Sequence, residues 1–305
     1  MTPFVRHPAP GEPAREVLVE VGDSALSGLL AEPAGGEPRA LLMAVHGAGM
    51  HAGYFHTATA PGLSLLELGS RLGFSVWAPD RPGIGASADL PDDRISLFPQ
   101  ASLLLDALDS FTADHPVGGG VVLVGHSYGL KVALAMAAEP RGSRLLGIDG
   151  AGSGIRFAAF DGDGQPVQPP IRRGERGPAW GPATIYPRGT FRRASLPLAP
   201  SPPVQLSESG RWPDDFRSFA GRIRIPVRLT FGEHEGYWSL DESHFDELRA
   251  VLAHVPILAM EIEPHAGHNI SLGWVARGYH LKVVAFAERC LLAGPVPDGR
   301  GRQAS

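Results

Sequence analysis

The sequence predicts an α/β protein whose mostly parallel sheet is covered by helices on both faces. Short apolar runs, Gly-containing turns and helical patterns alternate along most of the chain, as they do in right-handed βαβ crossovers. Several of these runs are apolar at every position, which is typical of strands buried on both faces of a sheet. With 305 residues, 43% of them hydrophobic, the chain is long enough for one large α/β domain.

The expected elements follow in order from the N-terminus. Two strands at 16–21 and 26–30 should form a hairpin around Gly22 and Asp23. Apolar runs then predict strands at 40–45, 74–78, 121–124 and 145–148, and helical periodicity predicts helices at 63–72, 102–111 and 128–138. Beyond residue 221 we expect strands at 227–231 and 257–262 and helices at 243–255 and 275–292.

The alternation is interrupted between residues 155 and 221. This stretch is rich in Pro, Gly and Arg, and it shows no clean helical or strand period. A segment of this length without periodicity is usually a functional lid or a disordered insertion. We therefore expect residues 1–154 and 222–305 to form one core that carries residues 155–221 as a lid. Two separate domains are the weaker interpretation.

Composition excludes several classes of function. A net charge of −5 argues against a general nucleic-acid binder. The single cysteine, Cys290, excludes a disulfide framework and a multi-cysteine metal site. His46, His51 and His56 have no acids nearby, so we expect no metal there either. The chain has no long apolar stretch and no nucleotide-binding glycine loop, so we expect no membrane span, no cofactor and a cytoplasmic location.

The strongest sequence motif follows the apolar run at 121–124. It reads Gly125-His126-Ser127-Tyr128-Gly129, a G-x-S-x-G pattern, and a helical pattern follows directly. A sharp strand-to-helix turn would hold the serine in strained backbone and lift its hydroxyl above the sheet. Glycines are needed on both sides because neighbouring chain passes too close for a side chain. The pattern indicates Ser127 as a nucleophile.

A nucleophilic serine needs a base, and the base needs an acid that orients it. His265 and His268 both follow the strand expected at 257–262, and we favour His268 because it lies beyond a flexible Ala-Gly step. For the acid we prefer Glu235, on the far side of the turn after the strand at 227–231. Glu233 and Asp149 remain alternatives.

A tetrahedral oxyanion needs backbone N–H donors. The run at 40–45 ends in a loop of small residues, His46-Gly47-Ala48-Gly49, whose amides can approach a substrate closely. We expect the amides of Ala48 and Tyr128 to bind the oxyanion, with Gly47 and Gly49 beside the substrate. Tyr237 and Trp238 either line the pocket or pack locally.

Five motifs in this order resemble the α/β-hydrolase superfamily, over about residues 15–155 and 222–292. They are His46-Gly47-Ala48-Gly49, Asp80-x-x-Gly83-x-Gly85-x-Ser87, Gly125-x-Ser127-x-Gly129, Gly232-x-x-Glu235 and His268. The resemblance implies a mostly parallel eight-stranded sheet, a Ser–acid–His triad in that chain order and a lid inserted after the sixth strand. The chain departs from the family pattern in having Glu where Asp is more frequent.

The function expected from these residues is cleavage of an ester or thioester of a small organic substrate, without a cofactor, through a Ser127–His268–Glu235 triad and an acyl-enzyme. One alternative uses the same triad for acyl transfer or acyl-group elimination in bacterial natural-product biosynthesis. Another is a non-catalytic scaffold that binds a ligand. Arginines at 172, 173, 176, 188, 192 and 193 could serve an anionic substrate, a carrier protein or a CoA-linked substrate, but a solvated arginine-rich surface is the preferred interpretation.

Overall fold

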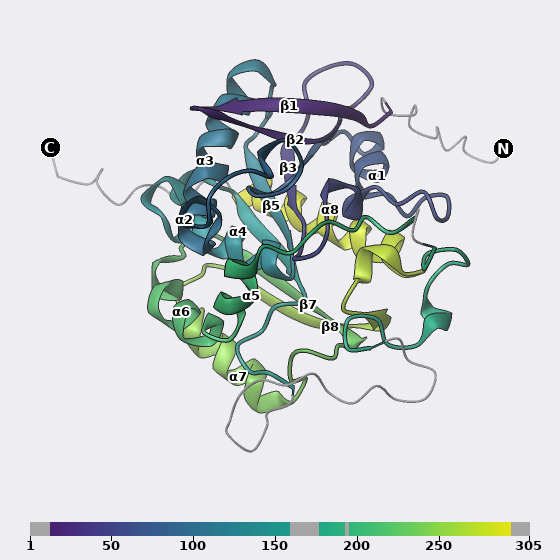
Figure 1. Ribbon diagram of the computed structural model, residues 1–305, viewed down its shortest axis with the longest axis vertical. Helices are drawn as coiled ribbons and strands as arrows, with labels where there is room; N and C mark the ends of the chain where they lie inside the picture. Colours follow the sequence, from purple (N-terminus) through teal and green to yellow (C-terminus); the bar gives the residue numbers. More distant parts are fainter. Residues whose placement is uncertain (1–12, 159–176, 193–194, 294–305) are drawn as a thin grey trace, which may run out of the picture.

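A central eight-stranded sheet organises the protein (Figure 1). The computed structural model describes residues 13–158, 177–192 and 195–293. The strand order is β1-β2-β4-β3-β5-β6-β7-β8; the pairs β1–β2 and β2–β4 are antiparallel, and all other neighbours are parallel. The predicted fold class is therefore confirmed. The strands are β1 (Arg15–Val21), β2 (Ser24–Ala31), β3 (Leu41–Val45), β4 (Ser75–Pro79), β5 (Val121–His126), β6 (Gly147–Ala151), β7 (Val227–His234) and β8 (Leu258–Gly267).

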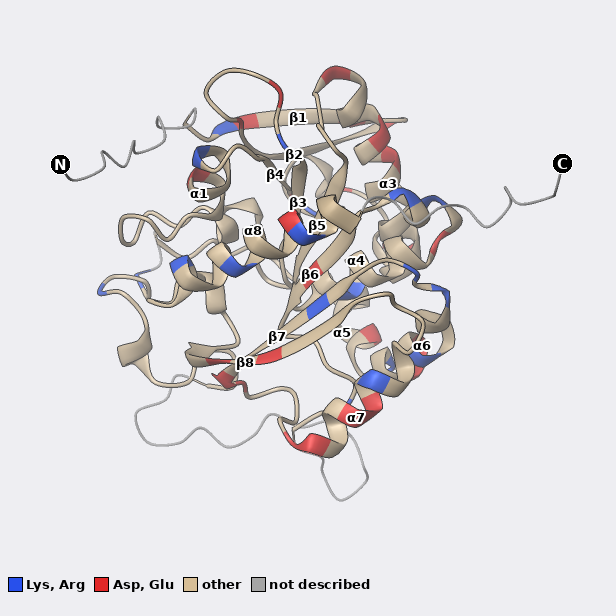
Figure 2. Ribbon diagram, turned by 180° about the vertical axis from the view of Figure 1, so that it is seen from behind, with Lys and Arg blue, Asp and Glu red and all other residues tan. Residues whose placement is uncertain are grey.

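The central strands are buried on both faces because they carry apolar side chains at successive positions. In β3, Leu41, Met43 and Val45 join one hydrophobic cluster, and Leu42 and Ala44 join the other, as the alternation of side chains along a strand requires. Neither β3 nor β5 contains an acidic or basic residue other than the histidine that ends β5, and charged residues lie mainly on surrounding helices and loops (Figure 2).

Helices cover both faces of the sheet (Figure 1). On one face α3 (Leu97–Asp114) packs against α4 (Tyr128–Ala138), together with α6 (Trp212–Phe219) and α7 (Glu242–Val251). On the other face α1 (Leu65–Arg71) packs against α8 (Ala276–Ala293). Two shorter helices, α2 (Asp92–Ile95) and α5 (Pro203–Ser209), contact each other.

The segment between β6 and β7 contains more regular structure than the sequence indicated. Helices α5 and α6 both fall within it, and α6 buries Trp212, Phe216 and Phe219 on one face. The sequence showed no helical period here because the two helices are short: α5 has seven residues and α6 has eight. Part of this segment, 159–176 and 193–194, lies outside the described residues, including the arginines at 172, 173, 176 and 193.

Several strands extend beyond their predicted ends, and in β6 and β8 the extension affects candidate site residues. β6 runs to Ala151, so Asp149 lies inside the strand, whereas the strand predicted at 145–148 would end just before it. β8 runs through Pro264 to Gly267, although proline lacks a backbone donor. His265 within β8 has a φ of 56°, which marks an irregularity at this edge strand.

Cys290 lies on the buried side of α8. It is fully buried, its sulfur lies close to Gly147 in β6, and burial raises the pKa of its thiol to about 12. Across the three described ranges, no helix is both long enough and apolar enough to cross a membrane.

Candidate active site

Ser127 lies at the turn from β5 into α4 and has a strained backbone. Its φ is 53° and its ψ is −120°, a combination that costs a residue with a side chain about 1–3 kcal/mol. The amide of Ser127 donates to the carbonyl of Ala151 at 2.8 Å, and the hydroxyl of Ser153 donates to the carbonyl of Ser127 at 2.9 Å. These two bonds from the β6 side hold the turn in place.

The two glycines of the motif are required by close backbone contacts. A Cβ on Gly125 would lie 2.6 Å from the Cα of Leu130, and a Cβ on Gly129 would lie 2.1 Å from the carbonyl oxygen of Val45. Both distances are far shorter than any real Cβ contact. The predicted reason for these glycines is confirmed.

His268 and Glu235 come together with Ser127. The Nε2 atom of His268 lies 2.9 Å from the Oγ of Ser127, and its Nδ1 lies 2.8 and 3.0 Å from the two carboxylate oxygens of Glu235. The side chain of Glu235 is fully buried and that of His268 is 6% exposed. With Nδ1–H donating to Glu235, a neutral His268 presents Nε2 as an acceptor for the serine proton.

The alternative residues lie in other arrangements. Glu233 is half exposed and accepts a hydrogen bond from the backbone N–H of His265. Asp149 is fully buried and forms an ion pair with Arg228 at 3.1 Å; burial raises its pKa to about 6. Neither carboxylate contacts His268 within the part of the chain that the structure describes.

His126 supports the position of His268. Its Nε2–H donates to the carbonyl oxygen of His268 at 2.9 Å, and Tyr54 stacks on its ring with centroids 4.2 Å apart. Burial lowers the pKa of His126 well below its ordinary value, so the ring is neutral. On the other side the ring of Tyr237 meets His268 edge-on at 4.8 Å. The role of His126 was not predicted from the sequence, although this residue directly precedes Ser127.

The loop after β3 passes next to the nucleophile. A Cβ on Gly47 would lie 3.1 Å from the Cβ of Ser127. The carbonyl oxygen of Gly47 accepts bonds from the Nδ1–H of His46 at 2.9 Å and from Arg81 at 3.2 Å. In a trans peptide the N–H of Ala48 points the opposite way from that carbonyl, so it stays clear of these donors. Tyr128 is the first residue of α4, and its amide has no acceptor within the helix.

Trp238 and Gly49 are the other residues considered as substrate contacts, and they lie in different surroundings. The indole N–H of Trp238 donates to the carbonyl of Gly152 at 3.0 Å, which places its ring beside the β6 end of the site. Gly49 has a φ of 71° and faces Ser201 in the insertion.

Arg81 is a buried cation next to the site, at a position that the family motif starting at Asp80 leaves unspecified. It is fully buried and donates to the side-chain oxygens of Gln100 at 2.7 Å and Gln205 at 3.0 Å, besides Gly47. Burial lowers its pKa to about 10. The backbone N–H of Arg81 also donates to Nε2 of His46 at 2.9 Å, which requires that nitrogen to be unprotonated. No sequence pattern distinguishes this arginine from the other twenty-odd basic residues.

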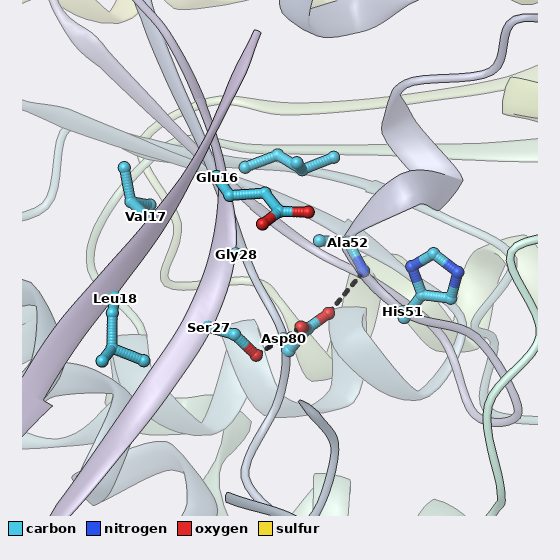
Figure 3. A pocket seen from close by; sticks show the side chains of 9 residues that line it. Glu16, Val17, Leu18, Ser27, Gly28, His51, Ala52 and Asp80 are labelled. Atoms are coloured by element: carbon cyan, nitrogen blue, oxygen red, sulfur yellow. Dashed lines mark hydrogen bonds between the residues drawn. The ribbon is translucent and has the colours of Figure 1, made fainter. Parts of the chain in front are cut away.

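The neighbouring Asp80 has a structural role. Its carboxylate accepts from the hydroxyl of Ser27 at 2.6 Å and from the amide of Ala52 at 2.8 Å, and so links β2 to the segment after the Gly47 loop (Figure 3). A pocket of about 500 Å³ between β1, β2 and this segment is lined in part by Asp80 and His51 (Figure 3).

The three histidines near this loop each have a separate partner. His51 accepts from the amide of Gly53, and His56 bonds to the hydroxyl of Ser64, whereas His46 bonds to Gly47 and Arg81. Among the described residues, no three His, Cys, Asp or Glu side chains gather as metal ligands do.

Comparisons with known proteins identify the family of the chain. The model of the alpha/beta hydrolase family matches residues 42–277. No curated protein is similar enough in sequence to match the chain.

Three of the similar solved structures cover nearly the whole chain. A thermostable carboxyl esterase from Bacillus coagulans is 16% identical, with a TM-score of 0.65 over 92% of this chain and 99% of that one. A monoglyceride lipase from Saccharomyces cerevisiae is 14% identical, with a TM-score of 0.63 over 98% and 100%. A thioesterase domain from the curacin biosynthetic pathway is 13% identical, with a TM-score of 0.55 over 90% and 100%. At these identities the structures support the fold, and the family model covers more than two thirds of the sequence; the chain belongs to the alpha/beta hydrolase family.

Proposed function

We propose that this protein is a serine hydrolase that cleaves an ester or thioester of a small organic substrate. The observation that carries the proposal is the continuous chain of hydrogen bonds from Glu235 through His268 to the hydroxyl of Ser127. A buried carboxylate, an imidazole and a strained serine in this order are the parts of a nucleophilic triad. The esterase, lipase and thioesterase neighbours are consistent with this reaction class.

In the proposed reaction, the Oγ of Ser127 attacks the carbonyl carbon while Nε2 of His268 takes the hydroxyl proton. Glu235 keeps Nδ1 protonated and stabilises the imidazolium that forms. The amides of Ala48 and Tyr128 donate to the oxyanion. His268 then returns the proton to the leaving alcohol or thiol, and a water activated by the same nitrogen hydrolyses the acyl-enzyme.

The segment between β6 and β7 is proposed to act as a lid that sets substrate specificity. Its described parts contact several loops of the site. Glu208 in α5 accepts from the hydroxyl of Tyr128 at 2.7 Å, Asn269 donates to the carbonyl of Ala179 at 3.0 Å, and Ala199 donates to the carbonyl of Gly49 at 3.0 Å. A substrate that reaches Ser127 would therefore meet this segment first. Gly47, Gly49, Tyr237 and Trp238 are proposed to line its path.

Labelling with a fluorophosphonate tests the nucleophile directly. The wild type should gain one adduct, which peptide mapping locates at Ser127, and Ser127→Ala should gain none. Hydrolysis of a neutral acyl thioester, measured by the release of its thiol, should also depend on Ser127. A folded wild-type protein that takes up no label on long incubation, or an equal adduct on the Ser127→Ala variant, would contradict the proposal.

A further inference from the structure

Lys131 lies one helical turn after the nucleophile. It is the fourth residue of α4, and residues four apart on a helix are neighbours on one face. Helical side chains also tilt toward the N-terminal end of their helix, so the lysine chain runs back toward the end of α4 where Ser127 lies. Only 5% of Lys131 is exposed, and its ammonium group lies beside the ring of Tyr128, the residue that follows Ser127.

Three aromatic rings surround the ammonium group. The Nζ atom lies 5.8 Å from the ring centroid of Tyr128, 5.3 Å from that of Trp212 and 5.4 Å from that of Trp238. Each ring is fixed by a hydrogen bond at its polar edge. Tyr128 donates to Glu208, Trp212 to the carbonyl of Gly154 and Trp238 to the carbonyl of Gly152. The three aromatic rings, each held by its hydrogen bond, partly stabilise the ammonium group.

The cation has no paired anion. Lys131 forms no ion pair and no hydrogen bond within the described ranges of the chain. The acids that influence it are Glu208 in α5 and Asp215 in α6, which act at a distance. Glu208 already accepts bonds from Tyr128 and from the amide of Leu97. Burial lowers the pKa of Lys131 to about 7, against the attraction of these two acids.

A second buried cation lies on the same aromatic residue. The guanidinium of Arg81 is 4.9 Å from the ring centroid of Tyr128, and its hydrogen bonds all go to uncharged oxygens. Around Tyr128 there are therefore two buried cations. Glu208 is bonded to the Tyr128 hydroxyl, and Asp215 acts on Lys131 from a distance, so neither acid is directly paired with a cation in the described ranges. Buried charges are normally paired because their desolvation is costly, so this region favours the entry of an additional anion.

We propose that Lys131 binds a carboxylate carried by the substrate and makes the enzyme selective for anionic esters or thioesters. This inference rests on the proposed hydrolase function, since the anion is selected beside Ser127. Lys131 would act as a specificity residue whose N–H groups donate to the carboxylate. The rings of Trp212 and Trp238 would pack on the carbon chain between that carboxylate and the scissile carbonyl.

Matched thioesters that differ only in charge test this inference. The first series places a carboxylate on the acyl group: succinyl, glutaryl and adipyl thioesters of N-acetylcysteamine, each paired with the neutral analogue in which a methyl ketone replaces the carboxylate. The second series places it on the leaving group: the acetyl thioester of 3-mercaptopropionate, paired with that of 4-mercapto-2-butanone. Thiol release gives kcat/KM for each member, corrected for spontaneous hydrolysis.

In at least one pair, the wild type should prefer the anionic member by about 10- to 100-fold, the range expected for a hydrogen bond to a charged group. Lys131→Met, which keeps an unbranched helix-forming side chain, should bring that ratio close to one, and Lys131→Arg should retain part of it. The control is Lys282→Met, which removes the only other lysine of the chain. Lys282 lies on α8 and is paired with Glu261 and Glu263 on β8, so its loss should leave the ratio unchanged.

A lysine that only anchored α6 to the core would affect both members of a pair equally, so the ratio separates binding from structure. Equal rates for both members of every pair in the wild type, or an unchanged ratio in a folded Lys131→Met variant, would overturn the inference. These results are distinct from failure of the hydrolase proposal, in which Ser127 takes up no fluorophosphonate and no thioester of either charge is cleaved.

Discussion

Gly129→Ala is a severe test of the proposed site because it adds one methyl group at a point where two backbones touch. The new Cβ would lie 2.1 Å from the carbonyl oxygen of Val45 and 2.4 Å from that of His46. The first oxygen belongs to the last residue of β3 and the second to the residue after it, which leads directly into the loop of Gly47 and Ala48. The methyl group can be accommodated only if α4 and the end of β3 move apart.

The size of that movement follows from the contact distances. An ordinary contact begins at 3.4 Å, so the oxygen of Val45 must move by about 1.3 Å relative to Gly129 (3.4 minus 2.1). Ser127 moves with α4 and the oxyanion loop moves with β3. A misplacement of about 1 Å between catalytic groups can lower a rate by about 10²-fold. Overpacking of this kind also destabilises a core by about 1–3 kcal/mol, partly offset by about 0.5–1 kcal/mol from replacing a helical glycine.

Steady-state hydrolysis and thermal unfolding measure both effects. We expect Gly129→Ala to lower kcat/KM by about 10²-fold and to lower Tm by a few degrees. The matched control is Gly278→Ala in α8, where no atom lies within 4 Å of the added Cβ; it should keep full activity and an equal or higher Tm. The reasoning fails if Gly129→Ala retains kcat/KM within about threefold of the wild type with an unchanged Tm.

Three further predictions address the acid, the oxyanion loop and one buried histidine. Glu235→Gln should lower kcat by about 10³- to 10⁴-fold, because an amide cannot stabilise the imidazolium, whereas the half-exposed Glu233→Gln should stay within about threefold; equal effects of the two would remove Glu235 from the triad. Arg81→Lys keeps the charge but cannot reach three oxygens at once, so kcat should fall by about 10- to 100-fold with little change in KM, part of the loss known for a missing oxyanion donor; a change confined to KM would contradict this role. Burial lowers the pKa of His280 to about 3, so between about pH 6.5 and 3 the unfolded state binds a proton that the folded state does not, and stability falls as pH falls through this window. In urea titrations the loss of unfolding free energy from pH 7.5 to 4.5 should be about 2–3 kcal/mol smaller for His280→Gln, and an equal loss in both proteins would show that another group titrates.

Local sequence patterns predicted the parts of the fold that depend on neighbouring residues. The apolar run at 121–124 and the helical pattern at 128–138 correspond to β5 and α4, because burial on both faces requires apolar residues at every position. The turn between them was predictable because only a narrow set of residues permits a positive φ at Ser127 between two close backbones.

Long-range pairing was not predictable in the same way. The choice of Glu235 over Asp149 depends on whether a carboxylate is already engaged, and Asp149 is paired with Arg228, 79 positions further along the chain. Arg81 and Lys131 gave no signal because their environments are made by distant segments: Gln205 in α5 for the first, and Trp212 and Trp238 for the second. Contacts between side chains from distant segments depend on the fold, and local sequence patterns do not indicate them.

The burial of Cys290 has a practical consequence for studying motion. It is the only cysteine of the chain, and a thiol with a pKa near 12 is almost entirely protonated at neutral pH and therefore a poor nucleophile toward alkylating dyes. A cysteine introduced at Leu206 in α5, a position that is 60% exposed, would then be the single reactive thiol without any prior cysteine removal. A fluorescent or spin label at that position would report the position of α5 relative to the core in the otherwise native sequence, before and after Ser127 is acylated.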